Sequence, residues 1–367
     1  MDEHRERWWG RWTGAMRSAW TRLVAALRRL WGRSEATAAL PPVTEADVAD
    51  APANFVAPEM APDAVVVERE AVPALRGRGA FVDGSFSNAA GVRPYKLFVP
   101  AALAPGPRAL VVMLHGCRQN PSDFATGTRM NEFAEAQGFV VLYPGQLDRA
   151  NHLRCWNWFS PDNQERGRGE PSLIADLTRY VIETQDIDPR HVFVAGLSAG
   201  GAMAAVLAAT YPDLYAAVGV HSGLPHAAAH NLATALSAMR HGPATRSQPM
   251  ARVPVPTIVF HGDADTTVHP DNGEELMAQA RWAIEAKADA GNGADMAVEE
   301  GQVEGGRAFT RTLHRDAQGR CDAEHWLVHG SGHAWSGGDG KGSFTDPKGP
   351  DASAQILRFF LEHPGRG

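Results

Sequence analysis

The run GLSAG at residues 196–200 limits the possible folds of this 367-residue chain more than any other segment. An apolar stretch at 192–195 precedes it and small residues follow from about position 201, so we expect a strand, a tight turn and a helix. Such a turn strains the serine backbone and packs strand against helix, which leaves no room for side chains on Gly196 and Gly200. It would expose Oγ of Ser198 and aim the N–H of Ala199 at a developing negative charge. The alternative is an ordinary strand–helix turn, because G-x-S-x-G matches arise by chance in a chain with 37 glycines.

The composition suits one large domain, or one domain with appendages, because 44% of the residues are hydrophobic and 21% are charged. A net charge of −7 argues against nucleic acid as the main partner. No stretch approaches the roughly 20 apolar residues that are needed to span a membrane. Three cysteines are too few for a disulfide scaffold, and their spacing does not match a zinc site.

Residues 1–34 have the pattern of a basic amphipathic helix, with tryptophans on its apolar side. Such helices lie in membrane interfaces or on other apolar surfaces, so we expect this segment to bind a membrane or a storage granule. The alternatives are a helix docked on its own domain, or disorder. The early arginines and the short apolar centre argue against a secretory signal. The apolar positions are Trp8, Trp12, Met16, Trp20, Leu23, Leu27 and Leu30, and the arginines, largely on the other face, are Arg5, Arg7, Arg11, Arg17, Arg22, Arg28, Arg29 and Arg33.

Residues 35–65 are rich in alanine, proline and acidic residues and predict a flexible linker, so the folded domain is expected at 66–367. In that domain, apolar runs alternate with helical patterns, which predicts a mostly parallel sheet with helices on both faces and antiparallel first strands. The expected strands are 65–70, 79–88, 93–100, 109–116, 139–145, 192–195, 217–223, 255–265, 307–316 and 323–335. The expected helices are 129–137, 171–185, 274–289 and 351–363, and we expect 226–251 to be irregular.

A second backbone donor for an oxyanion is expected in the loop that follows the apolar strand 109–114. The loop has the sequence LHGC, and we assign the donor to the N–H of Cys117, beside that of Ala199. Removing one such preorganised donor costs about 3–4 kcal/mol of transition-state stabilisation. The alternative is a plain strand end.

An acid and a histidine follow the serine in the order that an α/β-hydrolase fold requires. Asp265 comes after the strand PTIVF in the pattern G-x-x-D-x-x-V, with Asp263 as the second choice. A calcium loop is excluded, because the spacing and the closing glutamate are absent. His333 lies between a strand and the last helix, whereas His325 and His329 lie in or near the strand and are expected to be packed or solvated. His333 would deprotonate Ser198, and the acid would orient the imidazole. The predicted fold class is therefore α/β, with the α/β-hydrolase arrangement.

The segment 151–168 is a long loop that carries aromatic residues. Aromatic side chains above the carboxyl edge of a sheet often line a substrate cleft, so we expect Trp156 and Trp158 to bind substrate, with Trp335 as another wall. The alternative is that these rings only pack the loop. Cys155 can also pair with Cys117 in an oxidising compartment, which would leave one further thiol at Cys321.

Nine linked motifs together resemble the polyhydroxybutyrate depolymerase esterase family, part of the α/β-hydrolase superfamily and close to feruloyl and acetylxylan esterases. They are RPYKLFVP, LHGC, YPGQ, CWNWF, EPSLIAD, GLSAGGAM, HSGLP, HGDADTTVHP and GHAWSGG, within residues 90–363. The resemblance implies a serine esterase with Ser198, Asp265 and His333 as catalytic triad and Cys117 and Ala199 as oxyanion donors. The family is largely secreted, while this chain shows no convincing signal, so extracellular, cytoplasmic and surface-associated locations all stay open.

The function predicted from the sequence is hydrolysis of polyhydroxyalkanoate or short-chain acyl esters through an acyl-enzyme. One alternative is a feruloyl or acetyl esterase that acts on plant cell wall esters. Another is a membrane- or granule-surface protein that is anchored by residues 1–34. No cofactor is expected, because the glycine-rich run near residue 337 does not open a helix after a strand and lacks phosphate-loop order.

Overall fold

The computed structural model describes residues 79–102, 108–243, 255–285, 295–316 and 318–365. The predicted helix 1–34, the predicted linker 35–65 and the predicted strand 65–70 lie outside these residues.

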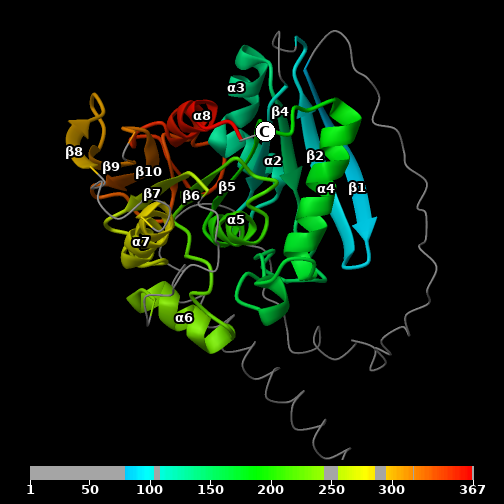
Figure 1. Ribbon diagram of the computed structural model, residues 1–367, viewed down its shortest axis with the longest axis horizontal. Coiled ribbons are helices and arrows are strands. Elements are labelled where there is room, and N and C mark those ends of the chain that lie inside the picture. The colour runs from blue at the N-terminus through cyan, green and yellow to red at the C-terminus, as the bar shows by residue number, and fades with distance from the viewer. Residues whose placement is uncertain (1–78, 103–107, 244–254, 286–294, 317, 366–367) are drawn as a thin grey trace, which may run out of the picture. The chain divides into compact units, whose positions relative to one another are not determined.

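A ten-stranded sheet runs through the described part of the chain in the order β1-β2-β4-β3-β5-β6-β7-β10-β9-β8 (Figure 1). The six strands from β4 to β10 pair in parallel, while β1 and β2 at one edge and β9 and β8 at the other pair antiparallel. The predicted mostly parallel sheet with antiparallel first strands is confirmed. The bounds are β1 Ala80–Asn88, β2 Gly91–Val99, β3 Leu110–Leu114, β4 Val140–Pro144, β5 Val192–Leu197, β6 Ala217–His221, β7 Thr257–Gly262, β8 Asp295–Gln302, β9 Ala308–Arg315 and β10 Cys321–Val328.

Helices cover both faces of this sheet, and each face has its own hydrophobic core. Alternate residues of a strand point to opposite faces, so Val112 of β3 joins one core and Val111 joins the other. The bounds of the helices are α2 Pro121–Thr128, α3 Met130–Gln137, α4 Gly169–Gln185, α5 Ala199–Thr210, α6 Leu232–His241, α7 Asp271–Glu285 and α8 Ala352–Glu362. A short 3₁₀ helix, η2, spans Pro161–Asn163, and the two-residue strands β11 (Trp335–Ser336) and β12 (Thr345–Asp346) pair with each other.

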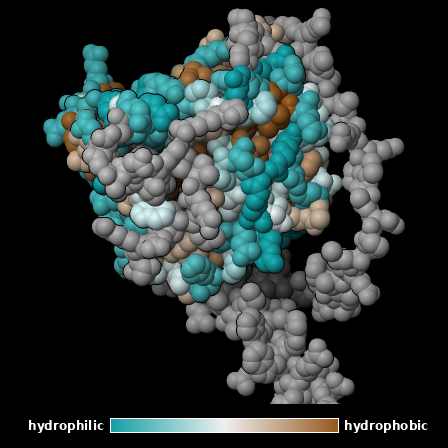
Figure 2. Space-filling view, viewed as in Figure 1, coloured by the Kyte–Doolittle hydropathy of each residue, from teal (hydrophilic) through white to brown (hydrophobic). Residues whose placement is uncertain are grey.

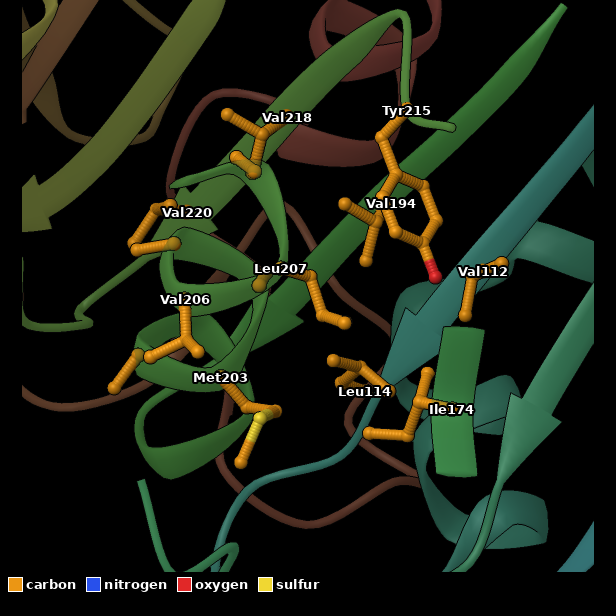
Figure 3. Close-up of a cluster of buried hydrophobic side chains, with 14 of the residues drawn as sticks. Val112, Leu114, Ile174, Val194, Met203, Val206, Leu207, Tyr215, Val218 and Val220 are labelled. Atoms are coloured by element: carbon orange, nitrogen blue, oxygen red, sulfur yellow. The ribbon is translucent and has the colours of Figure 1, made fainter. Parts of the chain in front are cut away.

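The first core lies between the central strands and the helices α4 and α5 (Figure 3). Leu114 of β3 and Val194 of β5 face Ile174 of α4 and Met203 of α5 there, and all four side chains are buried. Strands that are covered on both faces read as continuous apolar runs, which is why these strands could be recognised from the sequence.

The second core places α8 against the other face of the sheet. The helix begins at the cap Asp351, whose carboxylate accepts a hydrogen bond from the Ala354 N–H at 3.0 Å. Its stripe of apolar residues includes Phe360, which stacks on Phe193 of β5 with ring centroids 4.8 Å apart. Burying each such side chain contributes about 1.5–3 kcal/mol, so α8 covers this face of the sheet at β5.

Three of the longer elements were not predicted. Helix α6 lies in the segment that we expected to be irregular, although Asn231 and Thr234 form a capping box at its start and Gly242 ends it. Helix α2 begins at the cap Asn120 and has Pro121 in its first turn, which is a signal that the sequence carries. Strand β8 is largely exposed and has no apolar alternation, so only its pairing with β9 identifies it.

The surface visible in Figure 2 is mostly hydrophilic or neutral, and hydrophobic residues appear there in small separate areas. Across the described residues, the large hydrophobic side chains that are exposed lie on β2, α7, β8 and α8; they are Val92, Trp282, Met296, Val298 and Leu361. Within the same residues, every helix is too short or too polar to cross a membrane.

Candidate active site

Ser198 occupies a strained turn between β5 and α5. Its backbone φ is 58°, in the left-handed region that non-glycine residues rarely adopt, and its ψ is −121°. The Ser198 N–H donates to the carbonyl of His221 at 2.9 Å, which ties the turn to the end of β6. A strain of this kind persists only where the surroundings hold it, and it is typical of catalytic sites.

The two glycines of the GLSAG run let the surrounding backbone segments come close together. A Cβ atom on Gly200 would lie 2.6 Å from the carbonyl oxygen of His115 and closer still to that of Leu114. A Cβ atom on Gly196 would lie 2.8 Å from the backbone nitrogen of Gly201. Both positions therefore need glycine, and this close approach sets the loop after β3 directly beside the start of α5.

In the loop after β3, the N–H groups of the residues around Cys117 are hydrogen-bonded to other parts of the protein. The Gly116 N–H donates to Oε1 of Gln119 at 2.9 Å, the Gln119 N–H donates back to the Gly116 carbonyl at 3.3 Å, and the Arg118 N–H donates to the Leu153 carbonyl at 2.6 Å. The Cys117 N–H takes part in none of these bonds. At the start of α5, the N–H of Ala199 has no partner within its own helix, because the first N–H groups of a helix never do.

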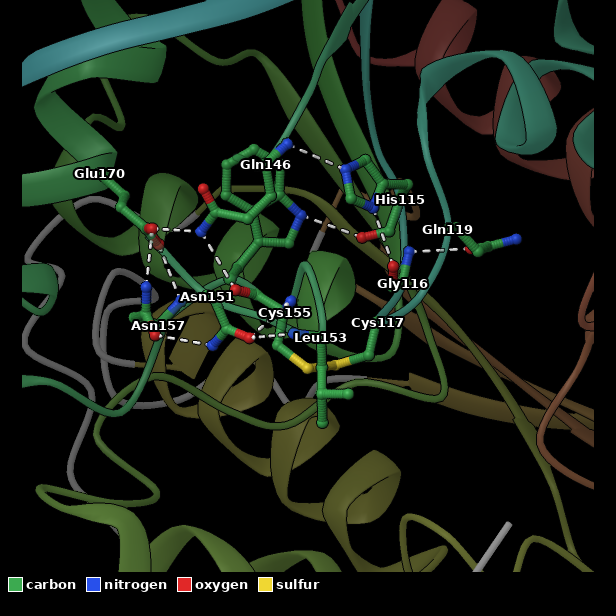
Figure 4. The surroundings of a disulfide bond; sticks show 11 residues. His115, Gly116, Cys117, Gln119, Gln146, Asn151, Leu153, Cys155, Asn157 and Glu170 are labelled. Atoms are coloured by element: carbon green, nitrogen blue, oxygen red, sulfur yellow. Dashed lines mark hydrogen bonds between the residues drawn. A yellow bond between two sulfur atoms is a disulfide. The ribbon is translucent and has the colours of Figure 1, made fainter. Parts of the chain in front are cut away.

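A disulfide joins Cys117 to Cys155, 38 residues along the chain (Figure 4). This is the pairing that the sequence allows, and Cys321 is a free cysteine. The bridge connects the loop after β3 to the loop that follows β4. The chain segment that the bridge closes includes the loop of the predicted oxyanion donor, so the disulfide restricts the movement of that loop.

A buried polar network supports the other side of the disulfide (Figure 4). The carboxylate of Glu170, at the start of α4, accepts hydrogen bonds from the side chain of Gln146 and from the Asn157 N–H, the latter at 2.7 Å. Gln146 in turn donates to the Cys155 carbonyl at 3.0 Å, and its backbone N–H donates to Nε2 of His115 at 3.1 Å. Buried polar groups that are fully bonded in this way make a region rigid.

His115 is neutral in this network. Burial lowers its pKa to about 4, a shift that the backbone bond to Gly116 opposes and the charge of Arg93 reinforces. Because Nε2 accepts from Gln146, the proton sits on Nδ1 and bonds to the Gly116 carbonyl at 2.8 Å. His115 thus braces the loop and does not act as a base.

Asp265 and His333 form a buried hydrogen-bonded pair. Nδ1 of His333 lies 2.7 Å from Oδ2 of Asp265, and Oδ1 accepts from the N–H groups of Thr267 and Val268 at 2.8 and 2.9 Å. Burial alone would raise the pKa of Asp265, but the charge and the hydrogen bond of His333 outweigh it and lower the pKa to about 2. Asp265 is therefore a carboxylate that fixes the Nδ1–H tautomer of His333 and leaves Nε2 as the basic nitrogen.

Asp263, the second choice of the sequence analysis, binds elsewhere. Its carboxylate contacts Nδ1 of His329 at 2.9 Å and accepts from the Gly330 N–H at 2.6 Å, and Nε2 of His329 lies 2.9 Å from Oγ1 of Thr310. Asp263 thus holds the beginning of the loop that carries His333, and Asp265 meets His333 itself.

The three tryptophans are not the exposed cleft walls that we predicted. Trp156, Trp158 and Trp335 are only 0%, 4% and 1% exposed. The Trp156 Nε1–H donates to the His115 carbonyl at 2.9 Å, and the Trp335 Nε1–H donates to Oγ of Ser353 at 3.1 Å. A buried indole needs such a partner, and each partner comes from a segment distant in sequence, so Trp156 and Trp335 brace loops.

Two residues that the sequence analysis did not assign hold this site together. Gln119 bonds the loop after β3 and also donates to the Ser343 carbonyl at 2.9 Å, in the segment that follows His333. His221 accepts the Ser198 N–H through its carbonyl and the Ser336 N–H through Nε2, each at 2.9 Å. The motif HSGLP was the available signal for His221, but its bonds depend on tertiary structure.

No group of three or more histidine, cysteine, aspartate or glutamate side chains within the described ranges is placed to hold a metal ion. The carboxylate of Asp263 is hydrogen-bonded to His329 and to one backbone N–H. The carboxylate of Asp265 is hydrogen-bonded to His333 and to two backbone N–H groups. These two carboxylates are therefore parts of the loop structure and of the pair with His333.

Comparisons with known proteins agree with the fold and with the motifs. The model of a family described as esterase PHB depolymerase matches residues 93–302. Poly(3-hydroxyalkanoate) depolymerase C of Paucimonas lemoignei is 33% identical over 248 residues, which cover 64% of this chain and 56% of that protein. Feruloyl esterase B of Neurospora crassa is 33% identical over 210 residues, which cover 53% of this chain and 70% of that protein. This chain thus spans little more than half the length of the depolymerase.

Among solved structures, an acetyl xylan esterase from Aspergillus awamori superposes with a TM-score of 0.58 at 21% identity, covering 78% of this chain and 100% of that chain. At that identity the likeness concerns the fold alone. The strand order, the parallel centre of the sheet and this superposition confirm the α/β-hydrolase fold that the sequence predicted.

Proposed function

This chain belongs to the PHB depolymerase esterase family, and from that premise we propose that it is a serine esterase in which Ser198 attacks carboxylic esters. The observation that carries the proposal is the pairing of Asp265 with His333 at 2.7 Å, in a fold that also holds Ser198 on a strained turn with a φ of 58°. An acid–histidine pair and a serine on a strained turn are the parts that acyl transfer requires.

In the first half of the proposed reaction, Nε2 of His333 takes the proton of Ser198 as Oγ attacks the ester carbonyl carbon. The carbonyl oxygen becomes an anion, and the N–H groups of Cys117 and Ala199 donate hydrogen bonds to it. His333 then gives its proton to the leaving alcohol, which leaves an acyl group on Ser198. Asp265 stabilises the transient imidazolium and stays ionised, because its pKa is lowered to about 2.

In the second half, a water molecule replaces the alcohol. His333 removes a proton from the water as its oxygen attacks the acyl carbon, and the same two N–H groups bind the second oxyanion. The bond to Oγ of Ser198 breaks, the serine recovers its proton from His333, and the carboxylic acid leaves. No cofactor is needed for any of these steps.

We propose short-chain acyl esters and soluble polyester oligomers as substrates. A surface that grips a solid polymer would present a contiguous apolar patch beside the site. Among the described residues, exposed large hydrophobic side chains are on β2, α7, β8 and α8, and none is in the loops that carry Ser198, Asp265 and His333. Small esters fit such a site better than crystalline polymer does.

A second candidate is hydrolysis of feruloyl or acetyl esters of plant cell walls. It is favoured by the 33% identity to a protein named feruloyl esterase B, which is the same identity as that to the depolymerase. The same triad and the same oxyanion donors would serve both reactions, so the two candidates differ only in the substrate that enters.

The test compares the wild type with Ser198→Ala on amorphous polyhydroxybutyrate, a short p-nitrophenyl ester and methyl ferulate. Wild-type hydrolysis of one or more of these, with the loss of nearly all activity in Ser198→Ala, is the expected result. The ranking of kcat/KM then selects the substrate class. A Ser198→Ala variant that keeps most of the wild-type rate would remove the serine from the mechanism.

The predicted surface-binding helix at 1–34 lies outside the described residues and stays a proposal. Deleting residues 1–34 should abolish binding to vesicles or to polyhydroxybutyrate granules and leave turnover of a soluble ester unchanged. If turnover of the soluble ester also collapses, the segment belongs to the catalytic fold instead.

A further inference from the structure

His221, the last residue of β6, contacts the two segments that must meet during catalysis. Its backbone carbonyl accepts the N–H of Ser198 at 2.9 Å. Its side-chain Nε2 accepts the N–H of Ser336 at 2.9 Å, three residues after His333. The residue is 1% exposed, so neither bond competes with bulk water.

The orientation of the His221 ring is fixed from all sides. The ring stacks between Trp335, at 5.1 Å between centroids and 26° between planes, and Phe260 of β7, at 5.7 Å and 15°. Because Nε2 accepts a hydrogen bond, the proton sits on Nδ1, which lies 3.2 Å from Oγ of Ser222. Burial, reinforced by the charges of His261 and His333 and opposed by that of Asp265, lowers the pKa of His221 to about 3. The ring therefore stays a neutral acceptor at ordinary pH.

We propose that the side chain of His221 is a positioning residue that sets the His333 loop relative to Ser198, a role that rests on the proposed hydrolysis by Ser198. The loop leaves β10 through Gly330 and reaches His333, and Ser336 is the first residue beyond it whose backbone is bonded to the end of β6. The bond that Nε2 of His221 accepts from the Ser336 N–H thus holds the chain just after the base, while Asp263 holds it just before.

Substitutions of His221 change only one of its two hydrogen bonds, the one that its side chain accepts from Ser336. The bond from Ser198 goes to the backbone carbonyl, which every substitution keeps. A variant without an acceptor at the Nε2 position leaves the Ser336 N–H buried and unpaired, which disfavours the native position of the loop. Nε2 of His333 then shifts relative to a nucleophile that stays in place, and a misplacement of about 1 Å can cost about 100-fold in rate.

The experiment compares His221→Gln with His221→Asn in the full chain. The two amides are alike in polarity, but only glutamine is long enough to place an oxygen where Nε2 lies. We expect His221→Asn to lower kcat by about 10- to 100-fold with KM unchanged, and His221→Gln to recover kcat to within about fivefold of the wild type. His221→Phe keeps the ring stack without the acceptor and should behave as His221→Asn does. Rates are expressed per folded enzyme, with the folded fraction measured by circular dichroism.

The outcomes separate this role from packing and from a failure of the proposed function. Equal losses in the glutamine and asparagine variants, or full activity in His221→Phe, would overturn the proposal. His325 on β10 is a histidine of intermediate burial and provides the control, since its glutamine and asparagine variants should not differ in kcat. An inactive wild type, or an active Ser198→Ala, would instead refute the serine esterase on which the proposal rests.

Discussion

Replacing Gly200 with alanine should disable the site through the backbone. The new Cβ would lie 2.6 Å from the carbonyl oxygen of His115 and closer to that of Leu114, whereas real Cβ atoms essentially never come within 3.0 Å of such an atom. The contacted atoms are backbone atoms and cannot rotate away. The start of α5 and the loop after β3 must therefore separate, by more than the 0.4 Å between 2.6 and 3.0 Å.

This separation pulls apart the two predicted oxyanion donors, because Ala199 opens α5 and Cys117 lies on the loop. Loss of one such donor lowers kcat by about 100- to 1,000-fold, so we expect Gly200→Ala to lose at least about 100-fold in kcat. Overpacking of this size also costs about 1–3 kcal/mol of folding free energy, which corresponds to a drop of roughly 2–12 °C in Tm.

The assay is hydrolysis of a short p-nitrophenyl ester, with circular dichroism on the same samples. Gly340→Ala is the matched control, because a Cβ at that exposed loop position meets only a carbon of Pro347, at 3.8 Å. A folded Gly200→Ala enzyme whose kcat stays within about threefold of the wild type would refute the reasoning, since the close approach would then not set the oxyanion site.

Three further predictions address the acid, the disulfide and the pH dependence of stability. Asp265→Asn should lower kcat by up to about 10,000-fold because it favours the wrong tautomer of the base, whereas Asp263→Asn should cost far less; equal losses would reverse the assignment. Reducing the bridge between Cys117 and Cys155, which closes 38 residues, should cost about 4 kcal/mol in the chain-entropy model and lower kcat; urea unfolding and ester assays with and without dithiothreitol test this, and unchanged stability would contradict it. Burial lowers the folded-state pKa of His115 to about 4, so below about pH 6.5 the unfolded chain binds a proton that the folded chain refuses, and stability falls as the pH falls toward 4. Between pH 6.5 and 5 this loss is about 1.6 kcal/mol, and a His115→Asn variant whose stability falls as steeply as that of the wild type over that interval would contradict it.

The sequence by itself determined the order of the buried strands and of most helices, and it identified the candidate catalytic groups. Strands that are buried on both faces must be apolar throughout, so β3, β4 and β5 stand out in any reading of the chain. The glycines around Ser198 also reveal the turn in the sequence, because a strained turn packed against a neighbouring backbone segment leaves no room for side chains. These signals are local, and the sequence states them directly.

Only the tertiary structure decided which of the two aspartates pairs with His333 and which of the loop tryptophans are buried. Asp263 and Asp265 are two residues apart and chemically identical, and only the path of the loop after β10 shows that Asp265 meets His333. The tryptophans could be called exposed from sequence, because aromatic residues in a long loop carry no sign of what covers them. In the structure, the indole N–H of Trp156 bonds to the His115 carbonyl just after β3, and that of Trp335 bonds to Ser353 in α8.

The same reason separates the unpredicted elements from the predicted ones. β8 has no apolar alternation of its own and exists through its hydrogen bonds to β9. His221 gains its place from contacts with Ser198, Phe260 and Ser336, which are brought together only when the sheet forms. Local backbone preferences and burial patterns can be recognised in the sequence, because they depend on neighbouring residues. Contacts between distant segments depend on how the folded chain packs, and at this site that packing sets the geometry on which the chemistry depends.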